Sequence, residues 1–145
     1  MSAGSERGRR FDEHGIITSI AQIKPGHAEK LKTILKALRA QEDSPGKKIG
    51  TIHFVRWVLI DNDTRLLFTS NFDGSWDEYI DIFIDKVHEG LDAIWSNCEG
   101  FPAGGSRDRE AFKKYIEQTE YQADYFWCAY PDLTVREILA NRAKA

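Results

Sequence analysis

Two segments that read as β-strands carry apolar side chains on both faces, and this limits the folds open to the chain more than any other feature. In the segment from Thr51 to Asp61, one face holds Ile52, Phe54, Val58 and Ile60, and the other holds His53, Val55, Trp57 and Leu59. The segment from Ala123 to Tyr130 divides into Tyr125, Trp127 and Ala129 against Phe126, Cys128 and Tyr130. A sheet with one face in water alternates apolar and polar residues, so both sides of this sheet are expected to be covered. We expect a second copy of the chain to supply one cover; a terminal helix folded across a monomer is the alternative.

The other strands and the first helix follow from periodicity and turn residues. Gly15 to Ile23 is rich in β-branched residues and is followed by a Lys-Pro-Gly turn, which predicts the first strand. Apolar residues at helical spacing predict a helix from His27 that ends before Ser44. Arg65 to Phe72 predicts a strand that forms a hairpin with the strand at Thr51 to Asp61.

Three helices and one strand are expected in the second half. From Trp76 to Trp95 the apolar residues form one stripe, and Ser75 with Glu78 has the spacing of a capping box. A shorter helix is expected around Phe112, Tyr115 and Ile116, and a terminal helix from Thr134 to Ala143 after the strand that ends at Tyr130. This order contains the ferredoxin-like βαββαβ arrangement, so the predicted class is α+β, with two helices on one face of an antiparallel sheet and extra C-terminal helices.

Composition bounds the class of protein. A chain of 145 residues has the size of one domain, and we expect residues 1–14 to form a flexible tail and residues 15–145 a single ferredoxin-like domain. The net charge of -3 predicts no general attraction to nucleic acid or to an anionic membrane. The apolar runs are far shorter than the roughly 20 residues of a membrane helix. A soluble protein is therefore predicted. With only two thiols, Cys98 and Cys128, we expect reduced cysteines and a cytoplasmic location, and one disulfide bridge between them is left open.

The chain also resembles a known superfamily. Gln22-Ile23-Lys24-Pro25-Gly26, ahead of the first helix, resembles the first strand-to-helix junction of the dimeric α+β barrel superfamily, which includes small monooxygenases, heme-degrading monooxygenases, chlorite dismutases and dye-decolourising peroxidases. The resemblance covers Gly15 to Tyr130 as a pattern of elements. His53 to Trp57 and Ser70 to Gly74 are similar to motifs of bacterial proteins described as peroxidase-related. The resemblance implies a homodimer that oxidises a small apolar or aromatic molecule, with heme or with oxygen alone.

Two polar residues of the strand at Thr51 to Asp61 are candidate catalytic residues. His53, expected on the same face as Trp57, has a side chain whose pKa moves easily across neutrality, so it suits an acid, a base or a heme ligand. A packed core histidine is the alternative. Arg56 interrupts an apolar strand, and a buried guanidinium needs a carboxylate, which a ligand, Asp73 or Asp124 would supply.

Asn71 is the third candidate catalytic residue, because its amide offers both a donor and an acceptor to a ligand. The alternative is that Asn71 only shapes the turn at Gly74. The candidate substrate-binding residues are three large aromatic residues and one acid: Trp57, Trp76, Asp73 and Trp127. Packing in the core is the alternative for the tryptophans.

The resemblance to the small heme-degrading enzymes implies His88 as an iron ligand, with Trp76 upstream on the same helix. Those enzymes also use an asparagine on the first strand, where this chain has Thr18, Ser19 and Gln22. A solvated histidine on the flank of the helix is the alternative for His88. No Cys-x-x-Cys or His-x-x-x-His pair occurs, so no structural zinc site is predicted.

The two remaining histidines are expected to have local roles, His27 at the start of the first helix and His14 in the tail. The predicted function is therefore that of a small-molecule oxidative enzyme, of monooxygenase or peroxidase type, with an apolar pocket between sheet and helices. A non-catalytic dimer that binds a hydrophobic ligand or a larger enzyme is the alternative.

Overall fold

The computed structural model describes residues 10–11, 14–41 and 44–144. Its antiparallel sheet has the order β1-β2-β4-β3, in which β1 contributes two residues and the other three strands nine each. The strands are β1 (Arg10–Phe11), β2 (His14–Gln22), β3 (Ile52–Ile60) and β4 (Arg65–Asp73). The helices of the described residues are α1 (Ala28–Arg39), α2 (Pro45–Ile49), α3 (Trp76–Trp95), α4 (Arg109–Thr119) and α5 (Val135–Lys144). The predicted α+β class with an antiparallel sheet is confirmed.

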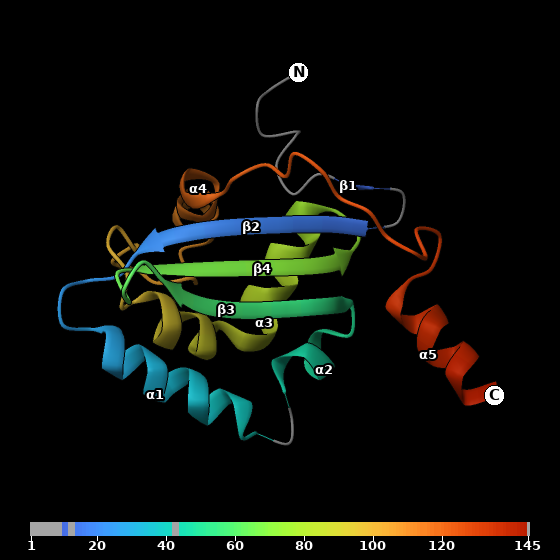
Figure 1. The fold of residues 1–145 in the computed structure, drawn as a ribbon, viewed down its shortest axis with the longest axis horizontal. Coiled ribbons are helices and arrows are strands. Elements are labelled where there is room, and N and C mark those ends of the chain that lie inside the picture. The colour runs from blue at the N-terminus through green and yellow to red at the C-terminus, as the bar shows by residue number, and fades with distance from the viewer. Residues whose placement is uncertain (1–9, 12–13, 42–43, 145) are drawn as a thin grey trace.

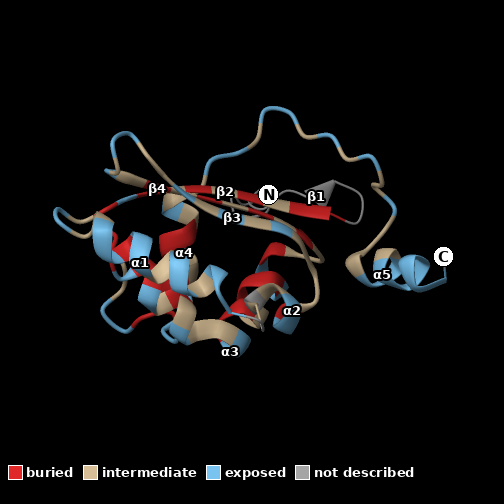
Figure 2. Ribbon diagram, turned by 60° about the horizontal axis from the view of Figure 1, so that its bottom comes forward, coloured by how far each residue is buried: buried red, intermediate tan, exposed pale blue. Residues whose placement is uncertain are grey.

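Helices α1 to α4 lie on one face of the sheet, which we call the helical face, and α5 lies apart beyond one end of the sheet (Figures 1 and 2). Alternate residues of β4 point into the core between sheet and helices: Leu66, Phe68, Ser70 and Phe72 are buried. Opposite them, α3 contributes Tyr79, Phe83 and Trp95. The ring of Tyr79 stacks on Phe72 at a centroid distance of 3.9 Å. This aromatic layer fixes which face of each strand is internal.

Helix α3 starts where the capping box predicts, because the Ser75 hydroxyl accepts a hydrogen bond from the Glu78 backbone N–H. Its single apolar stripe is interrupted, however. Val87 has non-helical backbone angles (φ -139°, ψ 31°), so the helix bends there. The short helix α2, which the sequence pattern did not predict, is capped by Ser44 and begins with Pro45.

The predicted fourth strand from Ala123 to Tyr130 is wrong. Strand-like backbone pairing is seen where the chain approaches the sheet: Glu120 forms a bridge with Ser19, and the Tyr121 N–H donates to Thr18 O at 2.7 Å. The chain then leaves the edge of β2, runs beside this edge on the side of the sheet away from the helices, and passes the end of β2 near β1 on its way to α5 (Figures 1 and 2). The two residues of β1 pair with the first residues of β2, so that part of the edge is already occupied. We call residues 121–130 the crossing segment.

The termini differ from the prediction in two respects. His14, expected in the tail, is the first residue of β2 and is buried, while residues 1–9 of that tail lie outside the described residues. Helix α5 forms but does not fold across the sheet, and it has no buried residue. The helical cover proposed for a monomer is therefore wrong in this structure.

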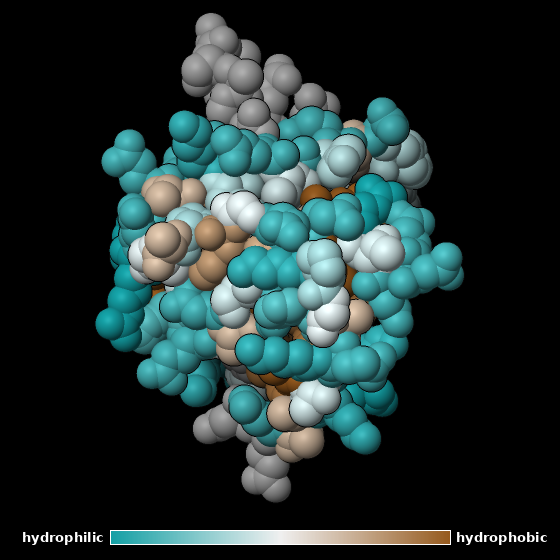
Figure 3. Space-filling model, turned by 90° about the vertical axis from the view of Figure 1, so that its left-hand side faces the viewer, coloured by the Kyte–Doolittle hydropathy of each residue, from teal (hydrophilic) through white to brown (hydrophobic). Residues whose placement is uncertain are grey.

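The end of the molecule away from α5, where β2 meets the loop to α1, presents mainly hydrophilic residues with scattered apolar atoms (Figure 3). The large exposed apolar side chains lie elsewhere, on β3, the crossing segment and α5: Phe54, Val58, Tyr121, Tyr125, Trp127 and Leu139. Among the described residues, no helix is both long enough and apolar enough to cross a membrane.

Candidate functional site

The site lies on the face of the sheet opposite the helices, which we call the open face, at the end near α5. Residues paired across an antiparallel sheet point to the same side. Asp73 pairs with His14, and Asn71 pairs with Ile16. On β4 these two residues alternate with the buried Phe72, so Asp73, Asn71 and His14 share the open face.

A β-bulge brings His53 to the same face. Ile52 pairs with Phe72 and Phe54 pairs with Asn71, so His53 is the extra residue of β3 between two consecutive partners on β4. Simple alternation would place His53 and Trp57 on one face, as the sequence predicted. The inserted residue shifts the alternation, as bulges beside functional sites commonly do. His53 therefore adjoins the open face, whereas Trp57 packs into the core against Phe68, and the shared face predicted for the two is wrong.

His53 and Asp73 form the closest polar contact of the site. Nε2 of His53 lies 2.7 Å from Oδ1 of Asp73, and their side chains are only 4% and 12% exposed. The second carboxylate oxygen of Asp73 accepts a hydrogen bond from the backbone N–H of Val135 at 2.8 Å. The carboxylate is thus held from two directions, by β3 and by the first residue of α5.

A second imidazole completes the cluster. The ring of His14 lies 4.4 Å from the ring of His53, centroid to centroid. His14 is 1% exposed, and its Nε2 lies 3.1 Å from the carbonyl oxygen of Tyr130, to which it donates. The Sγ atom of Cys128 lies 3.9 Å from the same nitrogen. Two histidines and a carboxylate from three strands therefore meet beneath the end of the crossing segment.

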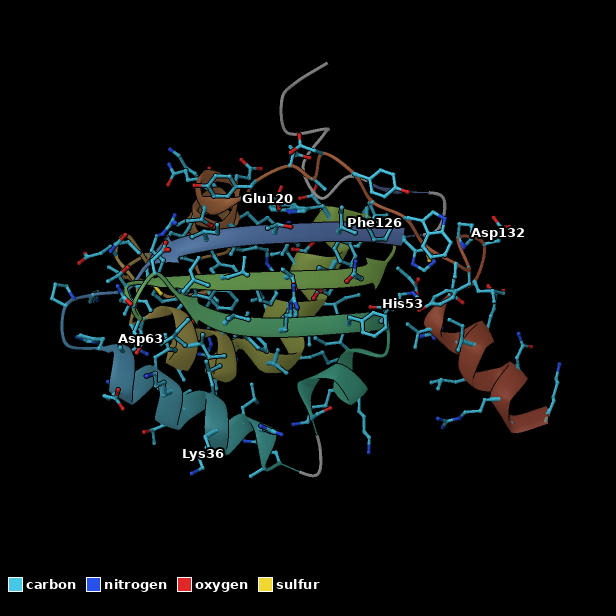
Figure 4. All side chains as sticks on the ribbon, viewed as in Figure 1. Lys36, His53, Asp63, Glu120, Phe126 and Asp132 are labelled. Atoms are coloured by element: carbon cyan, nitrogen blue, oxygen red, sulfur yellow. The ribbon has the colours of Figure 1, made fainter. Side chains whose placement is uncertain are left out.

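A pocket of about 350 Å³ opens beside this cluster, between the open face and the crossing segment. His53 on β3 and Phe126 on the crossing segment lie at this end of the sheet (Figure 4). The described residues that line the pocket are His14, His53, Phe54, Asn71, Phe126, Trp127, Cys128, Ala129 and Tyr130. Polar groups at one end of an otherwise apolar cavity are typical of sites for small organic molecules.

Four of the candidate residues therefore lie together, and the others do not. His53, Asn71, Asp73 and Trp127 surround the pocket or its polar end. Arg56 is exposed on the open face, and its Nε donates to the Thr69 hydroxyl at 3.2 Å. The expectation of a buried guanidinium paired with Asp73 or Asp124 is wrong, because the strand face that carries Arg56 is the one without helices.

Trp57 and Trp76 lie on the helical side. Trp57 lines a different pocket, of about 520 Å³, between β3 and the helices α1, α2 and α3. The Trp76 indole N–H donates to the Glu120 carboxylate at 2.9 Å, which ties the start of α3 to the chain after α4. An apolar pocket between sheet and helices thus exists, but the candidate catalytic residues do not line it.

The surroundings of His88 do not fit a heme ligand. The Nε2 atom of His88 contacts the Arg107 guanidinium, which only donates hydrogen bonds and therefore occupies the lone pair that iron would need. The adjacent pocket is lined by Leu38, Gln41, Lys48, Lys86, Val87, His88, Glu89 and Gly90. Its charged lining is unlike the apolar walls of a porphyrin pocket. Trp76 is the first residue of α3, about 18 Å from His88 at 1.5 Å per residue.

Sequence reasoning missed His14, Cys128 and the carbonyl of Tyr130 as parts of the site. His14 precedes the run of β-branched residues that predicts the first strand, so local sequence places it in the tail. Its role depends on the register that pairs it with Asp73. Cys128 and Tyr130 reach the site because the crossing segment leaves the sheet edge, an event that no local pattern predicts.

Comparison of the chain with protein-family models, curated proteins and solved structures finds no match. The functional assignment therefore depends on the geometry of the site and on the resemblance described above.

Proposed function

We propose that this protein is a small-molecule enzyme whose active site is the open-face pocket around His53 and Asp73. The observation that supports this proposal is the 2.7 Å contact between the His53 imidazole and the Asp73 carboxylate at the polar end of an apolar pocket. The other ion pairs among the described residues are mostly formed by exposed or half-exposed side chains, such as Lys32 with Asp63. A shielded histidine that is oriented by a carboxylate suits proton transfer.

The pair of His53 and Asp73, which we call the dyad, suggests roles for the pocket residues. A carboxylate only accepts, so the Nε2 of His53 carries the proton toward Asp73, and Nδ1 is left to take a proton from a substrate. Phe54, Phe126 and Trp127 give the pocket apolar walls, and Asn71 adds an amide that orients a polar substituent. These surroundings favour a small aromatic or apolar substrate that carries a removable proton.

The oxidative class of the reaction comes from the resemblance to the small monooxygenases and peroxidase-related proteins. Proton abstraction by a histidine prepares an electron-rich aromatic molecule for oxidation, so the dyad is compatible with that class. We derive no step from heme, because the surroundings of His88 do not fit it.

The proposed active form is a homodimer in which the open faces of two copies meet. Phe54 and Val58 on β3 are 65% and 38% exposed on the open face, and Trp127 of the crossing segment is 69% exposed. Neighbouring apolar side chains of this size on one surface favour association with another protein surface. A two-fold related copy would cover them and close the outer side of the pocket.

The pocket on the helical face supports a second candidate function, the binding of an apolar ligand without catalysis. Its lining combines apolar residues, Trp57 and Phe83 among them, with polar side chains such as Lys36 and Arg39. The buried Nε1 of Trp57 has no hydrogen-bond partner within the described part of the chain. A buried donor without a partner is costly, and a ligand acceptor would satisfy it. Trp57→Phe, which removes this donor and keeps an aromatic ring, is then expected to weaken ligand binding without abolishing turnover.

The test of the proposed function is oxygen or peroxide consumption with a panel of small phenols and quinols. We expect His53→Gln and Asp73→Asn each to lower turnover by about 100-fold or more, the usual effect of losing a general base. His88→Gln is the matched control, since His88 lies on α3 away from the pocket, and its turnover should equal that of the unmodified protein. Melting temperatures of all three variants are measured alongside. Unchanged turnover in correctly folded His53→Gln and Asp73→Asn would contradict the proposal.

A further inference from the structure

We propose that His14, His53 and Asp73 bind one divalent transition-metal ion. One potential ligand atom from each of these residues lies within 4.8 Å of those of the other two. The three residues come from three adjacent strands, so the backbone that holds them is rigid: His14 begins β2, His53 is the bulged residue of β3, and Asp73 ends β4.

The donor set selects the class of cation. Imidazole nitrogen suits zinc, iron, copper and nickel, whereas magnesium and calcium prefer oxygen ligands only. Ligands that bind a zinc-sized ion at about 2.0–2.2 Å lie roughly 3 to 4 Å from one another. The 2.7 Å between Nε2 of His53 and Oδ1 of Asp73 is slightly shorter, as expected where a proton occupies the position between them. Small rotations of the two side chains would admit a metal ion.

The partners behind the three ligands match those found at metal sites. Metal-binding histidines commonly donate their second N–H to a backbone carbonyl, and metal-binding carboxylates are themselves hydrogen-bonded. Nε2 of His14 donates to Tyr130 O at 3.1 Å, which leaves Nδ1 as the lone pair of the neutral ring. The Val135 N–H donates to Oδ2 of Asp73 at 2.8 Å, which leaves Oδ1 toward the cluster. The chain around α5 therefore orients two of the three ligands.

A metal ion also accounts for two shielded imidazoles beside one carboxylate. The rings of His14 and His53 are 4.4 Å apart, and the Asp73 carboxylate lies 2.7 Å from His53. With both rings neutral, each offers a lone pair, and a dication bound between them and Asp73 is the common partner. Three protein ligands leave coordination positions open, and the pocket of about 350 Å³ beside them has room for water or substrate.

This inference rests on the proposed function and changes one role in it. With the metal ion bound between His53 and Asp73, His53 would be a ligand, and a metal-bound hydroxide rather than Nδ1 of His53 would take the substrate proton. Two histidines and one carboxylate with open positions are the ligand set of non-heme iron oxygenases, so the inference supports the oxidative class independently of the resemblance. His88 is not one of the proposed metal ligands.

The test is titration of the full-length, chelator-treated protein with Co²⁺, followed by visible absorption and by isothermal calorimetry. We expect one Co²⁺ per chain, with the absorption bands of a cobalt ion bound by nitrogen and oxygen. His53→Gln and Asp73→Asn, which keep the size of each side chain, should each weaken binding by about 100-fold, and His14→Gln likewise. His27→Gln and His88→Gln are the controls and should bind Co²⁺ with unchanged affinity. Circular dichroism and melting temperature establish that each variant is folded.

Two results would overturn the inference: no saturable binding of Co²⁺, or binding whose affinity is the same in folded His53→Gln and Asp73→Asn. Zn²⁺ competition distinguishes a specific site from loose surface binding, since Zn²⁺ should displace Co²⁺ at equal stoichiometry. Because binding is measured without turnover, the two proposals fail separately. A protein that binds no metal but loses turnover in His53→Gln retains the proposed function, and one that binds metal but keeps turnover in that variant loses it.

Discussion

At the scale of single residues, the packing beside the site requires a glycine at position 15. Gly15 follows His14 on β2 and faces the ring of Phe72 across the sheet. A Cβ atom at this position would lie 2.5 Å from Cε2 of Phe72. That ring is fully buried and stacked on Tyr79, so it has no room to withdraw.

Gly15→Ala is therefore expected to destabilise the fold. Overpacking of a filled core costs about 1–3 kcal/mol, which a urea denaturation curve measures as a lower midpoint. Gly90→Ala is the matched control, because Gly90 lies in α3 with nothing within 4 Å of an added Cβ. Alanine is favoured over glycine in a helix by up to about 1 kcal/mol, so Gly90→Ala should raise the midpoint. Equal midpoints for Gly15→Ala and the unmodified protein would mean that Phe72 is free to move.

Cys98 gives a residue-scale prediction on pH. Burial raises the pKa of this thiol from 9.0 to about 12. The unfolded chain loses the thiol proton above pH 9 while the folded protein keeps it, so the free energy of unfolding falls as the pH rises from 9 towards 12. Burial also raises the pKa values of Tyr79 and Tyr115 from 10.0, so these groups add to the fall at higher pH.

Urea denaturation at several pH values between 8.5 and 10 isolates the contribution of Cys98. We expect stability to decline across this range in the unmodified protein and the decline to be smaller in Cys98→Ala. Cys128→Ala, which alters the half-buried thiol beside the pocket, should keep the contribution of Cys98. The same pH dependence in Cys98→Ala and the unmodified protein would contradict the assignment.

At the scale of elements, local sequence patterns predicted the ends of the long strands and the start of α3 correctly. The three long strands lie within one residue of their predicted ends, and α3 begins where Ser75 and Glu78 place it. Alternation and capping act over two to four residues, so they are visible in a linear sequence. The crossing segment has the alternation of a strand but does not form one. Phe126, Cys128 and Tyr130 are half-buried and their neighbours exposed, as in a strand, but a strand also needs a free edge to pair with.

The cap of α3 is testable at this scale. Ser75→Ala removes the hydroxyl that accepts from the Glu78 N–H at 3.2 Å, and loss of such a cap costs about 1 kcal/mol. Ser96→Ala, at the exposed C-terminal end of the same helix, is the control and should change stability little. Thermal denaturation of both variants measures the difference. A Ser75→Ala protein as stable as Ser96→Ala would show that the tertiary contacts of Trp76 and Tyr79 alone hold the start of the helix.

At the scale of the whole molecule, the open face is the surface on which the proposed dimer depends. Helices α1 to α4 cover one side of the sheet, and of the described residues the crossing segment lies on the other side (Figure 2). The apolar residues at Phe54 and Val58 are consequently exposed, although the sequence places them in a strand with two apolar faces. The proposed second copy of the chain would bury them.

Size-exclusion chromatography with light scattering tests this association. We expect the mass of a dimer at micromolar concentration, and the mass of a monomer for the double variant Phe54→Ser, Val58→Ser. Leu139→Ser on α5 is the control, since its side chain is also exposed but lies on a helix apart from the sheet. A monomeric unmodified protein with the open face exposed at high concentration would contradict the dimer and leave the pocket open on its outer side.

The sequence by itself determined the class of fold, the long strands, the main helices and four of the residues that surround the pocket: His53, Asn71, Asp73 and Trp127. Only the tertiary structure decided that His14 joins them, that Arg56 and His88 do not, and that the crossing segment forms a wall of the pocket. The physical reason is the range of the contacts involved. Local periodicity reports which face of one element is apolar, whereas the meeting of His14, His53 and Asp73 depends on strand register and on a one-residue bulge.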